Sequence, residues 1–146
     1  MISVELARGL SEGGVLWEPA PGDRFTIDQP NVVGEVFWIS HLTIDVHTFH
    51  GQPLLGFNGT TEWALDSVTL DTALWMPRED QLRELLGDRF VGLRREGEDW
   101  VVEISPDGDG STTAGTTTAT GTTTGTTAFR DADPECAYAE ALLSLV

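Results

Sequence analysis

The chain has 146 residues, which suffices for one domain with a single core and is too short for two. Its 24 acidic residues against 8 basic ones give a formal net charge of −16. This charge argues against a protein that holds nucleic acid or an anionic membrane through a basic face. All the basic residues are arginines, which excludes a phosphate-loop lysine and Schiff-base chemistry.

The compartment is predicted from the cysteine count and from the first residues. The single cysteine, Cys136, has no partner for an internal disulfide. The chain starts without the basic residues and apolar run of a signal peptide, and no stretch reaches the roughly 18 apolar residues of a membrane span. We therefore expect a cytoplasmic protein without a membrane partner.

The first half of the chain predicts one helix and two strands. Ser3 suits the N-cap of a helix that runs to about Ser11 and ends at Gly13-Gly14. Arg24–Ile27 is predicted to form a short strand. Over Glu35–Thr48 the side chains alternate between an apolar face and a second face that begins apolar and ends polar, which predicts one longer strand.

Asn58-Gly59 is the strongest turn signal in the sequence. Both residue types tolerate a positive φ, which favours a two-residue hairpin turn. The expected hairpin joins Pro53–Phe57 to Thr60–Leu65. In that register Leu54 lies opposite Trp63.

A helix and a hairpin are predicted next. Pro77 suits the first helical position and Gly87 the end of the helix. Its expected buried side chains are Leu82, Leu85 and Leu86. Arg89–Arg94 and Asp99–Ile104 form the hairpin, and Ala128–Arg130 adds a short edge strand.

The chain ends in a predicted helix capped by Asp133, with Pro134 at its first position. We expect its buried residues to be Ala137, Ala141, Leu142 and Leu145. The order of elements shows no strand–helix–strand alternation. It predicts an α+β fold, mainly an antiparallel sheet with about three helices, in a single domain over residues 1–146.

Ser105–Ala128 differs in composition from the rest of the chain. After Pro106-Asp107-Gly108-Asp109-Gly110 it consists almost wholly of threonine, glycine, alanine and serine. Side chains this small bury too little apolar area to offset the entropy of an ordered backbone. We therefore predict a disordered loop, inserted before the last helix.

Asp45, His47 and His50 are the candidate metal ligands. On a strand, Asp45 and His47 share one face about 6.6 Å apart, and His50 follows in the next turn. His41 lies roughly 20 Å from His47 along such a strand, too far to share an ion. The three ligands would suit a small metal-dependent hydrolase. The alternative is a solvated strand face with incidental histidines.

The candidate binding residues are tryptophans. The sequence has five of them, and Trp17 and Trp75 stand beside prolines between predicted elements, where large aromatic side chains are often half-exposed. We place a contact surface at Trp17, Trp63 and Trp75. With no complete catalytic constellation and no cofactor motif, the preferred function is a non-enzymatic module that binds another protein. A further alternative is an acidic, phage-related antagonist of a nucleic-acid-binding protein.

Three stretches carry a resemblance to a known group: residues 56–68, residues 74–87 and the alanine-rich last helix. Together they resemble short actinobacterial proteins often labelled "pilus assembly protein". They are more distantly similar to small proteins of Gram-positive bacteria and their phages. The resemblance implies no activity and no site residues. The large ATPase of that label needs a phosphate loop and its lysine, which this chain lacks.

Overall fold

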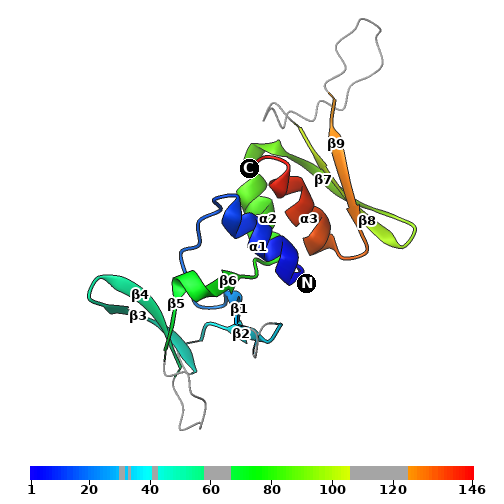
Figure 1. Ribbon diagram of the computed structural model, residues 1–146. Coiled ribbons are helices and arrows are strands. Elements are labelled where there is room, and N and C mark those ends of the chain that lie inside the picture. Colours follow the sequence, from blue (N-terminus) through cyan, green and yellow to red (C-terminus); the bar gives the residue numbers. More distant parts are fainter. Residues whose placement is uncertain (30–31, 33, 41–42, 58–66, 106–124) are drawn as a thin grey trace, which may run out of the picture. The chain divides into compact units, whose positions relative to one another are not determined.

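The computed structural model describes residues 1–29, 32, 34–40, 43–57, 67–105 and 125–146. These residues form three α-helices and nine strands in three antiparallel sheets, which confirms the predicted α+β fold (Figure 1). The chain divides into an N-terminal unit, residues 2–78, and a C-terminal unit, Met1 with residues 79–146. That the whole chain acts as one domain stays a prediction.

The N-terminal unit begins with α1 (Val4–Glu12), as predicted. The Ser3 hydroxyl oxygen accepts a hydrogen bond from the Leu6 amide at 3.2 Å and so satisfies one of the first free donors of the helix. Ala7 and Leu10 face inward and are buried. Arg8, on the outer face, pairs with Asp28 at 2.8 Å.

Two three-stranded sheets follow in this unit. In the first, β1 (Arg24–Ile27) lies between β2 (Val36–Trp38) and β6 (Ala73–Trp75). In the second, β4 (Gln52–Phe57) lies between β3 (Ile44–Phe49) and β5 (Ser67–Thr69), and the 3₁₀ turn η1 (Leu70–Thr72) leads on to β6. Both sheets contribute to one core, made of Phe25, Ile27, Ile39, Ile44, Leu55, Val68 and Ala73.

The predicted single strand over Glu35–Thr48 is wrong. Its residues form β2 and β3, which belong to different sheets. The chain reverses between Ser40 and Ile44, which form an antiparallel bridge with backbone hydrogen bonds of 2.7 and 2.9 Å. A single strand would place Ile39 and Ile44 on opposite faces, whereas the reversal brings both into the same core.

The hairpin in this region is formed by β3 and β4. His50 and Gly51 connect the strands with φ values of 49° and 81°, the positive values that a tight two-residue hairpin turn requires. Leu54 is paired with His47 on one side and Thr69 on the other, so its predicted pairing with Trp63 is wrong. Asn58-Gly59 and Thr60–Leu65 lie outside the described residues.

The C-terminal unit contains the predicted second hairpin. β7 (Phe90–Glu96) pairs with β8 (Asp99–Ile104) through a turn at Gly97, and β9 (Thr127–Asp131) pairs with the other side of β8. The edge strand predicted before the last helix is thereby confirmed. The predicted loop Ser105–Ala128 falls outside the described residues over positions 106–124.

The C-terminal unit also contains two α-helices. α2 (Glu79–Leu86) begins two residues later than predicted and runs into the 3₁₀ turn η2 (Gly87–Arg89). Leu82 and Leu86 are buried as expected, whereas Leu85 is 40% exposed. α3 (Pro134–Leu143) packs on β8, β9 and α2 and is buried along most of its length. Leu145, beyond its end, is only half-buried.

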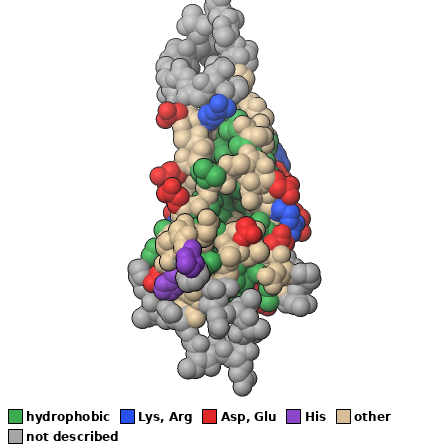
Figure 2. Space-filling view, turned by 60° about the vertical axis from the view of Figure 1, so that its left-hand side comes forward, with side chains coloured by type: hydrophobic (Ala, Val, Ile, Leu, Met, Phe, Trp, Pro, Cys, Tyr) green, Lys and Arg blue, Asp and Glu red, His purple; other side chains and the backbone are tan. Residues whose placement is uncertain are grey.

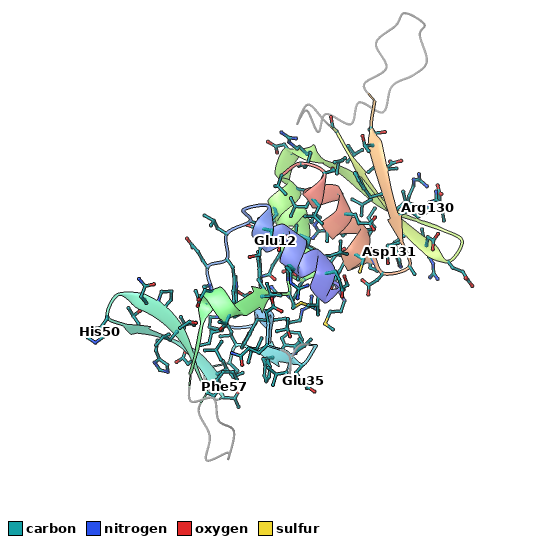
Figure 3. The ribbon with its side chains drawn as sticks, viewed as in Figure 1. Glu12, Glu35, His50, Phe57, Arg130 and Asp131 are labelled. Carbon is teal, nitrogen blue, oxygen red and sulfur yellow. The ribbon has the colours of Figure 1, made fainter. Side chains whose placement is uncertain are left out.

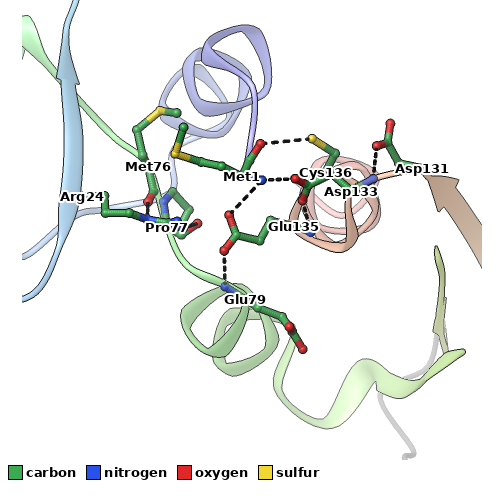
Figure 4. A network of polar contacts seen from close by, with 9 residues as sticks. All are labelled: Met1, Arg24, Met76, Pro77, Glu79, Asp131, Asp133, Glu135 and Cys136. Atoms are coloured by element: carbon green, nitrogen blue, oxygen red, sulfur yellow. Dashed lines mark hydrogen bonds and ion pairs between the residues drawn. The ribbon is translucent and has the colours of Figure 1, made fainter. Parts of the chain in front are cut away.

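The start of α3 is held by a polar network (Figure 4). Asp133 caps the helix by accepting from the Glu135 amide at 2.9 Å, as predicted, and it also pairs with the amino group of Met1. Burial raises the pKa of Asp133, but these hydrogen bonds outweigh it and the pKa lies below its ordinary value. Cys136 is buried, with its sulfur 3.8 Å from the Met1 carbonyl oxygen.

Candidate functional site

The N-terminal unit carries a surface pocket of about 220 Å³. Its walls come from α1, from the segment that follows α1, from Leu70 of η1 and from β6 with Pro77. Two of the predicted binding residues, Trp17 and Trp75, form part of it. Both are half-buried as predicted, although Trp75 is the last residue of β6 and does not lie between elements.

The end of α1 shapes one wall of the pocket. Gly14 has a φ of 89°, and the Val15 amide donates to the Leu10 carbonyl oxygen at 3.0 Å while the Gly14 amide donates to Ser11. This is the hydrogen-bond pattern of a Schellman motif, which brings the apolar residues before and after the helix end together. Leu10 and Val15 accordingly line the pocket side by side, and Leu16 follows with 86% of its surface exposed.

The indoles of Trp17 and Trp75 stack on each other. Their planes differ by 4° and their ring centroids lie 6.4 Å apart, within the range of an offset stack. Trp17 also packs against Phe25 of β1, with the ring centroids 6.0 Å apart. β6 pairs with β1 so that Trp75 lies opposite the same Phe25. The antiparallel register therefore brings together two tryptophans that are 58 positions apart in the sequence.

Trp17 is fixed by a buried carboxylate. Its indole N–H donates to Asp23 Oδ2 at 2.9 Å, and the same oxygen accepts from the Ala20 amide at 3.0 Å. Asp23 is 3% exposed, and the guanidinium of Arg78 lies 3.5 Å from its other oxygen. A buried carboxylate needs such donors to offset its lost hydration. These contacts fix the orientation of the Trp17 ring in the pocket wall.

Trp75 differs from Trp17 in the hydrogen bonding of its indole nitrogen. Its indole nitrogen is shielded from solvent and has no hydrogen-bond partner among the described residues. An unpaired buried donor of this kind costs about 1–3 kcal/mol.

The three predicted metal ligands lie on the β3–β4 hairpin (Figure 3). Asp45 Oδ1 accepts from the Val46 amide at 2.8 Å, and the His47 ring lies over Gly56 of the neighbouring strand. His50 occupies the tip, and both histidines are exposed (purple in Figure 2). No group of three His, Cys, Asp or Glu side chains in the described part of the chain is placed to hold a metal ion. The structure therefore does not bring Asp45, His47 and His50 together into a metal-binding group.

The remaining predicted residues lie outside the described part of the chain, and some residues of the pocket were not predicted. Trp63, the third predicted contact residue, lies outside the described residues, and so does His41. The sequence interpretation missed Leu16 and the apolar residues next to it. The signal for them was present, because three apolar residues, Val15, Leu16 and Trp17, directly follow a Gly-Gly helix end.

Comparison of this chain with protein-family models, with curated proteins and with solved structures finds no match. The resemblance to short actinobacterial proteins stays a prediction. Among the described residues, none of the helices has the length and apolar character needed to cross a membrane.

Proposed function

We propose that the chain is a non-enzymatic, cytoplasmic module that binds another protein through the pocket at Trp17 and Trp75. Trp63 remains the third predicted contact residue. The observation that carries the proposal is the stacked tryptophan pair in the wall of a pocket that mostly apolar residues line, with the exposed Leu16 among them. Exposed apolar side chains around a concavity are typical of protein interfaces, where large aromatic residues contribute most of the affinity.

The size of the pocket favours a side chain over a cofactor. Sites for small molecules and cofactors usually measure about 300–1,000 Å³. The volume here, about 220 Å³, suits one large apolar side chain of a partner protein. An anchor residue that enters a preformed pocket is the usual centre of a protein interface.

The rigidity of the pocket also supports a binding role. The Schellman motif fixes Leu10 and Val15, and Asp23 fixes the Trp17 ring. A surface that is already ordered loses little conformational entropy when a partner binds. These contacts therefore favour recognition of a partner without a change of fold.

The alternatives have less support. A metal-dependent hydrolase needs Asp45, His47 and His50 to converge, and among the described residues they form no metal-binding group. The antagonist of a nucleic-acid-binding protein rests on the net charge of −16 alone. It predicts a basic partner but no particular surface.

Capture of partners with two matched variants tests the proposal. Leu16→Glu places a charge beside the pocket, and Leu85→Glu makes the same change at an exposed leucine of α2. Both leucines are exposed, so we expect each variant to fold with little change in stability. The bait is the full chain in a lysate of the source cell, with cross-linking and mass spectrometry to locate the contact.

We expect a stoichiometric protein that cross-links beside Trp17 and is retained by Leu85→Glu but lost with Leu16→Glu. Capture of the same protein by all three baits would show that the pocket is not the contact surface. Capture of no protein by the wild-type bait would contradict the interaction role itself.

A further inference from the structure

Exposed acidic residues are the sequence neighbours of several residues that line the pocket. Glu12, Glu18 and Asp71 directly follow the lining residues Ser11, Trp17 and Leu70 in the chain, and all three are exposed. Arg8 lies one helical turn before Glu12 and partly balances its charge. Glu18 and Asp71 have no ion pair or hydrogen bond with other described residues. Three exposed carboxylates therefore stand next in sequence to residues that line the pocket.

The arginines of the N-terminal unit are engaged elsewhere. Arg8 pairs with Asp28, and Arg78 donates to the Gly22 carbonyl oxygen at 2.7 Å and lies beside Asp23. Arg24 is 8% exposed and donates to the carbonyl oxygens of Met76 and Pro77 at 3.3 and 3.0 Å (Figure 4). These three are the only basic residues in residues 2–78, against ten acidic ones. The unit that carries the pocket therefore has a clear excess of negative charge.

We propose that the pocket receives an apolar side chain of a partner segment whose neighbouring residues are arginine or lysine. This inference rests on the proposed function and specifies the chemistry of the partner. The pocket supplies the apolar contact, while Glu18 and Asp71 attract the flanking cations. Opposite charges around an interface steer association and select the partner more than they add affinity.

Charge also argues against a second copy of this chain as the occupant. Each copy carries a formal net charge of −16, so two copies repel each other. The arginines of residues 2–78 are already occupied within their own unit. A basic segment of another protein meets no such repulsion.

Fluorescently labelled peptides test the partner chemistry. Each probe has capped ends and one leucine in a Gly/Ser sequence, flanked on both sides by two arginines, two serines or two glutamates. A fourth peptide keeps the arginines and replaces the leucine by alanine. Binding to the full chain is followed by fluorescence anisotropy at low and high salt, with Leu16→Glu as the pocket variant.

A charge-neutralised pair of variants separates a local effect from a general one. Glu18→Gln/Asp71→Gln removes the two carboxylates beside the pocket. Glu35→Gln/Glu98→Gln removes two exposed carboxylates of other segments and leaves the net charge equal to that of the first variant. Sedimentation velocity of the peptide-free chain over a range of concentrations measures self-association.

At low salt we expect the arginine peptide to bind about fivefold tighter than the serine peptide, and the glutamate peptide to bind weakest. The preference should fall below about twofold in Glu18→Gln/Asp71→Gln and at about 1 M salt, but persist in Glu35→Gln/Glu98→Gln. Loss of binding with the alanine peptide and with Leu16→Glu completes the expected pattern.

The experiment distinguishes a failure of the basic-partner inference from a failure of the proposed binding role. Equal affinity for the arginine and serine peptides, lost in Leu16→Glu, would overturn the basic partner and leave the binding role intact. Self-association that Leu16→Glu abolishes would identify a second copy as the occupant and overturn the inference. Arginine-peptide binding unaffected by Leu16→Glu, or no binding by any peptide, would contradict the pocket as a binding site and the proposed function with it.

Discussion

Trp17 and Trp75 illustrate how much of the site a residue-by-residue interpretation of the sequence provides. Their positions beside prolines indicated half-exposed rings, and both are half-buried. Their stacking was not predictable, because it depends on the register that pairs Trp75 with Phe25 across β1 and β6. The bond from Trp17 to Asp23 likewise depends on how the connector folds back.

The candidate metal ligands show the converse case. Strand alternation correctly puts Asp45 and His47 on β3. What it cannot show is the neighbouring strand, where Gly56 leaves the space that the His47 ring fills. His50, which was expected to add a third ligand, occupies a turn position with positive φ.

At the residue scale, Asp23 provides a test of the pocket wall. Asp23→Ala removes the acceptor of the Trp17 indole and the Ala20 amide and leaves both donors unpaired. We expect a loss of about 2–3 kcal/mol in the free energy of unfolding, measured by urea denaturation. Asp23→Asn keeps an acceptor oxygen and should lose less.

Glu18→Ala is the control for this prediction, because it removes an exposed carboxylate next to Trp17. Its expected effect is within about 0.5 kcal/mol. If Asp23→Ala were as stable as Glu18→Ala, the buried carboxylate would not be what holds the Trp17 ring.

At the scale of elements, the N-caps of α1 and α3 and the second hairpin were predictable because short-range signals determine them. Ser3 and Asp133 cap their helices, and Gly97 forms the turn between β7 and β8. The prediction of one long strand over Glu35–Thr48 was wrong because alternation alone does not reveal a reversal of the chain at Ser40. Because of this reversal, Ile39 and Ile44 enter the same core although alternation assigns them to opposite faces.

The hairpin of β3 and β4 was not predicted, for a related reason. Its turn is His50-Gly51, a weaker signal than Asn58-Gly59 eight positions later. Histidine does occur at positive φ more often than most residues, but far less often than glycine or asparagine. The stronger dipeptide therefore misdirected the predicted pairing of β4.

Also at the scale of elements, the ends of β8 and β9 predict the effect of shortening the threonine/glycine segment. Ile104 pairs with Thr127, so deletion of residues 106–124 leaves Ser105, Gly125 and Thr126 to connect them, the length of a three-residue hairpin loop. A shorter loop costs less entropy to close, by about 1–2 kcal/mol. We expect an unchanged or higher melting temperature by calorimetry.

A matched replacement of residues 106–124 by a Gly/Ser sequence of equal length serves as the control and should melt like the wild-type chain. A deletion variant that melts well below both would show that the segment stabilises the fold, contrary to its predicted role as a loop.

At the scale of the whole molecule, the order of the elements predicted the fold class, and the net charge supports the partner chemistry that we propose. A net charge of −16, with no lysine, opposes self-association and favours a basic partner. The division into two compact units could not be read from the sequence, because no linker-like segment separates residue 78 from residue 79. The pocket could not be predicted either, since its walls come from parts of the chain up to 70 positions apart.

The most direct test of the central claim follows the indole N–H signals of the five tryptophans by ¹⁵N NMR while the arginine-flanked leucine peptide is added. Single Trp→Phe variants assign the signals. The pocket predicts that the Trp17 and Trp75 signals shift with a common binding curve, while that of Trp100 on β8 stays in place. Binding of the peptide with both pocket signals unchanged would contradict the claim that this pocket is the recognition site.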